Sequence, residues 1–155
     1  MIAVRPATPA DVPAMSAVLI ASITMLCGAD HHDDPAAIAA WTANKTPEGV
    51  AAMLAAPGTT MLVAMRDDRV AAVGSLVGRD EIGLNYVDPA CRFTGLSRAL
   101  VAALEARMRD AGTTIGRLKS TITAHPFYLS AGWIDSGPLY RGRFIEAYPM
   151  TKQLL

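Results

Sequence analysis

Alternating apolar and polar side chains predict β-strands at several places in the first 87 residues. The stretch 2–5 alternates and is expected to open the chain as a strand. Two apolar runs, 61–65 and 70–77, flank the polar turn 66–69, which is the pattern of an antiparallel hairpin. After a turn at 78–80, residues 81–87 alternate again. Three neighbouring antiparallel strands are therefore expected between residues 61 and 87.

Apolar side chains spaced three and four residues apart predict the helices. The first helix follows Thr8-Pro9-Ala10-Asp11, which supplies a capping residue and a first-turn proline, and Gly28 is expected to end it. Capped starts at Asp34-Pro35 and Thr46-Pro47 predict short helical segments before the hairpin, where two helices are expected to pack. A long amphipathic helix is predicted from Gly95 to about residue 111.

The last third of the chain predicts a parallel strand, a short helix and closing strands. Residues 113–120 are expected to lie parallel to 81–87, because a strand-helix-strand unit requires that crossover. Residues 126–132 predict a short helix, 133–134 resume extended structure, and 139–140 and 144–148 form a hairpin around 141–143. The predicted order is β-α-α-β-β-β-α-β-α-β-β.

Length, composition and charge narrow the class of protein. With 155 residues, the chain is expected to form one domain, 1–155, that buries about two thirds of its unfolded surface. No run approaches the ~18 uninterrupted apolar residues of a membrane span. The N-terminus lacks a signal-peptide pattern, and Cys27 and Cys91 show no CxxC spacing, so a cytoplasmic location is expected. Fourteen basic residues balance fourteen acidic ones, which argues against a nucleic-acid partner.

The stretch from Tyr86 to Leu100 carries the clearest chemistry. A strand runs through a short loop into the start of a helix, where about four backbone N–H groups have no internal partner and attract phosphate. Gly95 allows a ligand to approach the backbone, Thr94 and Ser97 add hydroxyls, and Arg92 adds a cation. Phosphate binding and an ordinary strand-to-helix loop are both compatible with this spacing.

Two local motifs make the functional interpretation of this stretch more specific. Val87-Asp88-Pro89 followed by Arg92-Phe93-Thr94-Gly95-Leu96-Ser97 resembles the acetyl-CoA motif of the GNAT superfamily of N-acetyltransferases, V-x-P with [QR]-x-x-G-x-[GA]. Ser97 replaces the usual final Gly or Ala, and Phe93 stands where a small residue is frequent. The stretch from Ala124 to Trp133 resembles the A-x-x-FY-x-x-x-G-[FW] block of the same superfamily, and the order of elements is similar as well.

This resemblance implies an α/β (α+β) fold: one GNAT-like domain with a mixed, mostly antiparallel sheet of six or seven strands and helices on both faces. It implies acetyl-CoA as cosubstrate, with the pyrophosphate on the amides of Phe93, Thr94, Gly95, Leu96 and Ser97. The pantetheine arm would lie where the strand 81–87 splays from its parallel neighbour at a bulge, with the thioester beside Tyr86 and Val87.

The resemblance also implies roles in catalysis. The backbone N–H of Val87 would stabilise the oxyanion formed when a primary amine of a small molecule or peptide attacks the thioester directly in a ternary complex. Tyr128 would protonate the departing thiolate, and Glu81 is the first candidate for general base, with Asp88 a weaker one.

Several alternatives stay open at this stage. Tyr128 could be only a packed residue, Glu81 only a solvated one, and the protein a non-catalytic acyl-CoA-binding module with a degenerate loop. The segment around His31 and His32, next to three aspartates, suggests a solvated loop or a lid more than a metal site, and no metal is expected. His31, Trp41 and Tyr140 are the candidates for the acceptor pocket, and the resemblance is compatible with a homodimer.

Overall fold

In the computed structural model, which describes residues 1–155, eight strands form one sheet in the order β1-β2-β3-β4-β5-β8-β6, with β7 paired to β8 off this path. Only β4 and β5 are parallel; every other pair of neighbours is antiparallel. The strands are β1 Ile2–Pro6, β2 Thr59–Arg66, β3 Arg69–Val77, β4 Glu81–Val87, β5 Ile115–Ser120, β6 Ile134–Asp135, β7 Tyr140–Arg141 and β8 Glu146–Gln153. The expected six or seven strands become eight because the two-residue strands β6 and β7 pair with β8 separately.

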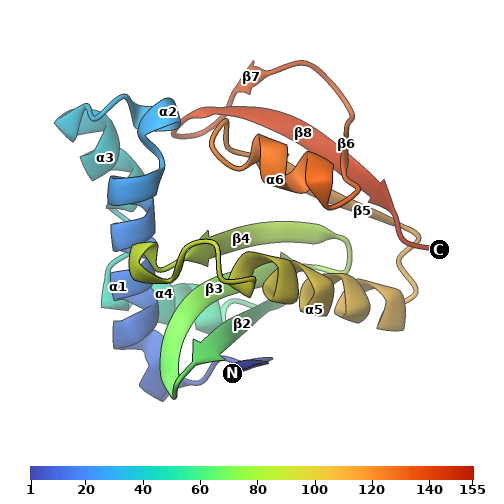
Figure 1. The fold of residues 1–155 in the computed structure, drawn as a ribbon, viewed down its shortest axis with the longest axis horizontal. Helices are drawn as coiled ribbons and strands as arrows, with labels where there is room; N and C mark the ends of the chain where they lie inside the picture. Colours follow the sequence, from blue (N-terminus) through green and yellow to red (C-terminus); the bar gives the residue numbers. More distant parts are fainter.

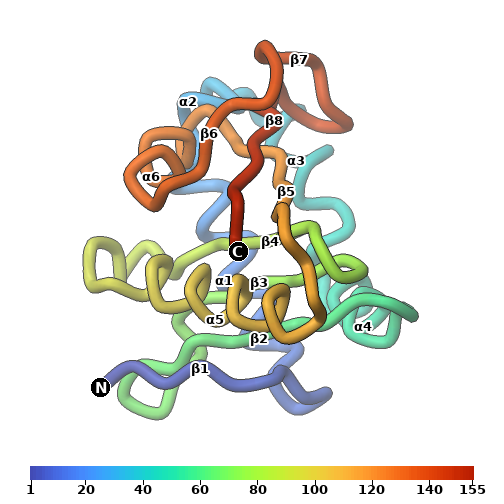
Figure 2. Tube along the Cα trace, turned by 90° about the vertical axis from the view of Figure 1, so that its right-hand side faces the viewer, coloured from blue at the N-terminus to red at the C-terminus, as the bar shows by residue number.

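The helices lie on both faces of the sheet, as predicted, but the region before the hairpin holds more of them. It contains α1 Val12–Leu26, the single turn α2 Gly28–His31, α3 Pro35–Thr42 and α4 Pro47–Ala55, instead of two helices. The other helical elements are η1 Pro9–Asp11, η2 Pro89–Cys91, α5 Leu96–Asp110 and α6 His125–Ser130. Helix α5 covers one face of β1–β4, and α1 with α4 covers the other (Figure 2).

Side-chain caps explain where the short helices begin. The Asp34 carboxylate accepts a hydrogen bond from Ala36 N–H, and the Thr46 hydroxyl accepts one from Gly49 N–H, both at 3.1 Å. A proline follows each cap in the first turn, where its missing N–H costs nothing. The start signals of α3 and α4 are therefore local, and the structure confirms both.

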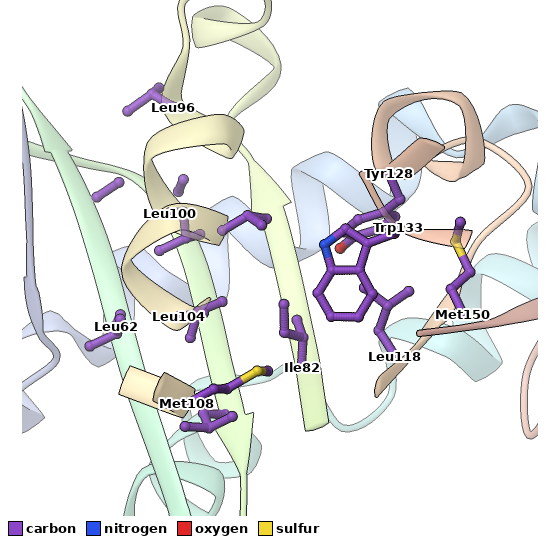
Figure 3. Close-up of a cluster of buried hydrophobic side chains, with 14 of the residues drawn as sticks. Leu62, Ile82, Leu96, Leu100, Leu104, Met108, Leu118, Tyr128, Trp133 and Met150 are labelled. Atoms are coloured by element: carbon purple, nitrogen blue, oxygen red, sulfur yellow. The ribbon is translucent and has the colours of Figure 1, made fainter. Parts of the chain in front are cut away.

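The larger core lies between α5 and the sheet. Figure 3 shows Leu96, Leu100, Leu104 and Met108 along one side of α5, facing Leu62 and Ile82. All four α5 side chains are essentially inaccessible to solvent, so their spacing fixes the helix on the sheet. The same core continues past β4 to Leu118, Trp133 and Met150.

A second core packs α1 on the opposite face, with Met15, Leu19 and Ile23 fully buried. The 18 residues Pro9–Leu26 have a mean hydropathy of 1.5, so by length and composition alone this stretch passes as a membrane span. A core helix of a folded domain passes the same test. Here the buried stripe of α1 contacts β3 and β4.

The sheet divides into two halves after the first two residues of β4, which lie opposite the middle of β5. Their parallel pairing is limited to Glu81 with Arg117 and Ile82 with Leu118. Beyond this point the half made of β1–β4 and the half made of β5, β6, β8 and α6 part, as Figure 1 shows. The divergence leaves the edge of β4 without a neighbouring strand where the sequence motif begins.

At the closed end, a buried carboxylate ties the two halves together. Glu105 of α5 is 5% exposed and lies 2.9 Å from the Lys152 ammonium of β8. It also accepts a hydrogen bond from the Trp133 indole at 3.3 Å. Because a buried carboxylate needs such partners, this contact holds β8 against α5 below the split.

Candidate active site

A bulge at Gly83 changes the direction of the side chains that follow it on β4. Ser75 pairs with Leu84 but Leu76 pairs with Ile82, so Gly83 is the extra residue. Ile82 therefore belongs to the core beneath α5, whereas Leu84 packs against the α1 core. A Cβ at Gly83 would lie 2.8 Å from Ser75 Oγ, so the bulge has no space for a side chain.

A cavity of about 530 Å³ lies in the split. Its wall combines the C-terminal half of α1, the bulged part of β4, the loop that leads into α5, the end of β5 and the start of α6. Most of the residues predicted to bind acetyl-CoA line it, namely Tyr86, Val87, Arg92, Phe93, Gly95, Leu96 and Ser97. Tyr128 lines it as well, so the two sequence motifs meet in one site.

The loop before α5 offers backbone donors to an anion. The backbone N–H groups of residues 93–98 make no hydrogen bond within the chain. Gly95 caps the helix with a φ of +86°, a left-handed conformation that glycine adopts without strain. The Thr94 hydroxyl is not available as a donor to an anion, because it already donates a hydrogen bond to Cys91 O at 2.6 Å. The free N–H groups at a helix start fit a pyrophosphate.

Phe93 is the residue at which this loop departs most from the motif. Its φ is +61°, so a bulky residue occupies a conformation that costs free energy for any side chain with a Cβ. Its side chain is 91% exposed, with the Arg92 guanidinium 4.5 Å from the ring centre. A glycine at this position would adopt the same conformation without strain.

The backbone of Val87 points towards the cavity. The neighbouring N–H, that of Asp88, donates to Ala71 O on β3 at 2.8 Å. Because N–H groups alternate in direction along a strand, the N–H groups of Val87 and Asn85 face the side from which β5 has diverged. Asp88 itself turns the chain: its carboxylate accepts from Ala90 N–H at 2.9 Å, which fits its expected role in turn formation.

Tyr128 is buried at the point where the halves of the sheet part. It is 5% exposed, and its phenol oxygen accepts a hydrogen bond of 3.1 Å from Asn85 Nδ2. Burial raises the pKa of Tyr128 to about 12, while the bond from Asn85 acts in the opposite direction. The phenol therefore keeps its proton at neutral pH, as a general acid requires.

Glu81 does not reach the cavity. Its carboxylate lies 3.4 Å from the Arg117 guanidinium, at the end of β4 where the two strands are still paired. Glu81 is absent from the cavity wall, as are all other aspartates and glutamates. Direct proton removal by Glu81 has no support in this geometry, and a role through water stays a prediction.

The three residues predicted for the acceptor pocket do not line the cavity. His31 is 2% exposed; its Nε2 bonds to Ile23 O at 2.8 Å and its Nδ1 accepts from Asp33 N–H at 3.0 Å. Trp41 is 3% exposed and packs edge-on against Tyr86. Tyr140 pairs with Ala147 in the hairpin of β7 and β8. His31 and Trp41 thus support the wall from behind, and the segment around His31 is a helical turn instead of a loop.

The structure adds residues that sequence reasoning missed. Only the folding of α1 and β5 around the split brings these residues to the site, because none of them belongs to a sequence motif. They are Asn85, Gly83, Cys27, Lys119 and the turn 121–123. Burial and then the negative charge of Asp30 raise the pKa of the Cys27 thiol to about 12, so it is not a nucleophile at neutral pH. No three His, Cys, Asp or Glu side chains are grouped as metal ligands.

Comparison with known proteins identifies the family to which the chain is similar. A family model described as an acetyltransferase (GNAT) domain matches residues 29–154. A structure from Rhodopseudomonas palustris, described as "GCN5-Related N-acetyltransferase: Aminotransferase, Class-II", is similar at 26% identity and a TM-score of 0.86, over 97% of this chain and 94% of that one. No curated protein matches the sequence.

Two further structures share the fold at lower identity. The PaiA N-acetyltransferase of Thermoplasma acidophilum, in complex with coenzyme A, has 16% identity and a TM-score of 0.82 over 99% of both chains. An aminoglycoside 6′-N-acetyltransferase of Enterococcus faecium has 15% identity and a TM-score of 0.72, over 100% of this chain and 97% of that one.

Proposed function

Because this chain belongs to the GNAT family of acetyltransferases, we propose that it transfers the acetyl group of acetyl-CoA directly to a primary amine of a small molecule or peptide. The observation that carries the proposal is the cavity in the split sheet. Its wall joins the free N–H groups at the start of α5 to the buried phenol of Tyr128. An anionic donor and its reacting thioester need these two features in one site.

The proposed binding of acetyl-CoA uses the loop and the unpaired edge of β4. The N–H groups of residues 93–98 and the Arg92 guanidinium hold the pyrophosphate. The edge of β4 at Asn85 and Val87 is available to the amide groups of the pantetheine arm, because no strand pairs with it there. These are the same backbone groups that a neighbouring strand would otherwise satisfy.

The proposed chemistry follows from two groups near the thioester. As the amine attacks, the Val87 N–H stabilises the negative charge that develops on the carbonyl oxygen. When the carbon–sulfur bond breaks, the electron pair stays on sulfur and the Tyr128 phenol donates its proton there. Asn85 holds the phenol oxygen from the other side, so the O–H is free to point into the cavity.

Proton removal from the amine needs no side-chain base in this proposal. A primary amine reacts through its neutral form, and no carboxylate lines the cavity to accept the proton. The proton passes to water in the open part of the site.

We also propose a cytoplasmic location, in keeping with the sequence, whereas the absence of membrane or nucleic-acid partners and the oligomeric state stay predictions.

A binding module without turnover is the second candidate function, and one observation favours it: the strained, exposed Phe93 in the loop. A two-part experiment separates the candidates. Thermal unfolding is followed with acetyl-CoA and CoA, with ATP and NAD as controls; a ligand at a hundredfold excess over its Kd stabilises the native state by about 2.7 kcal/mol. Release of free CoA is then measured with a panel of primary amines.

The outcomes are distinct. A shift with acetyl-CoA and CoA alone, together with amine-dependent CoA release, supports the acetyltransferase. The same shift without release for any amine favours the binding module. No shift with CoA at millimolar concentration contradicts both candidates, because each depends on the loop before α5.

A further inference from the structure

The two faces of the split sheet give the cavity two different sides. Asn85 and Tyr128 lie on the side of α6, where the thioester is proposed to react. On the other side, Tyr86 of β4 is joined by Ser22, Leu26 and Cys27 of the α1 end and by Lys119 of β5. Leu118 belongs to the core beneath α5, so strand alternation directs Lys119 to the α1 side. The acceptor must enter from this second side.

All charged side chains in the cavity wall are cations, namely Arg92, Arg98 and Lys119. Arg92 and Arg98 flank the start of α5, where the pyrophosphate is proposed to lie. Lys119 is therefore the charge that remains for the acceptor side. It is exposed and takes part in no ion pair of the structure.

The carboxylates near this side are already bound. Asp30 accepts hydrogen bonds from Ile122 N–H at 2.7 Å, from Thr123 N–H at 3.3 Å and from the Thr123 hydroxyl at 2.6 Å. Asp80 and Glu81 both contact the Arg117 guanidinium. The acceptor side thus has a free cation and no free counter-charge in its wall.

A second cation extends the positive charge above α1. Arg143 stacks on the ring of Phe144, 5.0 Å from its centre, and Phe144 packs on the cluster of Ile23, Cys27 and Trp41. Arg143 makes no ion pair either. Burial, and then the charge of Arg143, lower the pKa of the neighbouring Lys45 to about 8. Arg143 is therefore a second cation without an ion-pair partner on the lobe above α1.

We infer that the acceptor amine also carries a carboxylate, as an amino acid does, and that Lys119 binds this carboxylate. The inference rests on the proposed function and names its substrate class. A polyamine or an aminoglycoside would bring several positive charges to a wall that has no negative charge to pair with them. An amino acid supplies the missing counter-charge, and the surrounding cations favour the neutral form of its amine.

The test compares acceptors that differ only in charge. Acetylation is measured for the proteinogenic L-amino acids and for the carboxamide of each, with spermidine and kanamycin as polycations. A charge-assisted pair contributes roughly 1.5–3 kcal/mol, so the reactive acids should exceed their amides by about tenfold or more in kcat/KM. Lys119→Met should remove this preference and Lys119→Glu should reverse it.

Arg69→Glu is the matched control for Lys119→Glu, because it makes the same change in net charge at an exposed position at the start of β3. It should leave the preference intact, and all variants should keep the thermal shift with CoA. Three outcomes would overturn the inference. The amides or polycations could react as well as the acids, none of the acids could react, or the preference for acids could survive in Lys119→Met. If spermidine or kanamycin is acetylated instead, the proposed acetyl transfer stands and only the acceptor class is wrong.

Discussion

Asn85 of β4 donates a hydrogen bond from Nδ2 to the phenol oxygen of Tyr128 on α6, 3.1 Å away and across the split in the sheet. The bond joins two halves whose strands have already parted. It occupies an acceptor site of the phenol and leaves its O–H free, while Asn85 Oδ1 is buried without a partner in the chain. Asn85 is therefore a positioning residue for the proposed general acid.

Replacing Asn85 by Leu should lower kcat and change KM for acetyl-CoA little. A neutral hydrogen bond contributes about 1 kcal/mol, which corresponds to roughly a fivefold loss in kcat. Tyr128→Phe removes the acid itself and should cost about 100-fold or more. The control is the double variant: in the Tyr128→Phe background, Asn85→Leu should have no further effect on kcat, and an additive loss would contradict the positioning role.

The pH dependence of kcat provides a second measurement of the same contact. Tyr128 acts as an acid in its protonated form, and with a pKa of about 12 it keeps that proton throughout the range in which the protein is assayed. We expect no alkaline decrease of kcat from this group below about pH 11. A decrease centred near pH 8 to 9 that disappears in Tyr128→Phe would show that the phenol is a stronger acid than its burial indicates.

Phe93→Asn should stabilise the fold. Asn adopts the left-handed conformation with less strain than Phe, so the free energy of unfolding should rise by roughly 0.5–1 kcal/mol. Phe93→Leu is the matched control, because it shortens the exposed side chain but keeps the strain, and it should have no such effect. Urea unfolding measures both; a Phe93→Asn variant no more stable than Phe93→Leu would show that the loop stores no strain at this position.

Asp30→Ala should loosen the turn that precedes α6. The carboxylate holds Ile122 and Thr123 with three hydrogen bonds, so its loss should cost about 1–3 kcal/mol of stability and raise amide exchange over residues 121–130. Asp33→Ala is the control, since that side chain is 87% exposed. Equal exchange in the two variants would mean that the turn is held by its own backbone.

The acid stability of the fold should depend on Asp11. Two hydrogen bonds from Arg5, at 2.7 and 2.9 Å, hold the pKa of Asp11 well below its usual range. A group whose pKa is lower in the folded state stabilises the fold above its unfolded pKa, about 3.9, and this contribution is lost as the pH falls through the folded value. Asp11→Asn should thus destabilise the protein at pH 7, and the difference from the parent should narrow steadily below pH 4.

Thermal unfolding of the two proteins between pH 7 and pH 2 measures this effect. Asp67→Asn is the control, because Asp67 is 79% exposed and its nearest cation, the N-terminal ammonium, is 3.7 Å away. A constant difference between Asp11→Asn and the parent over the whole range would mean that the Arg5 contact does not depend on the charge of Asp11.

Local patterns in the sequence determined most of the fold. The alternation of β2, β3 and β4, the apolar stripe of α5 and the caps of α3 and α4 depend on residues close in the chain, and each element formed as predicted. The loop 92–97 and Tyr128 could be proposed as site residues from the sequence because their motifs are short and contiguous. Their meeting in one cavity followed from the strand-helix-strand crossover.

The tertiary structure alone decided how the site is completed. Gly83 shifts the register of β4, and only pairing with β3 shows which residues then face α6 and which face α1. Asn85 meets Tyr128 across 43 positions of sequence, and Glu81 is held by Arg117 at the closed end of the split. Sequence patterns record the periodicity of one segment, whereas these contacts depend on where segments distant in the chain come together.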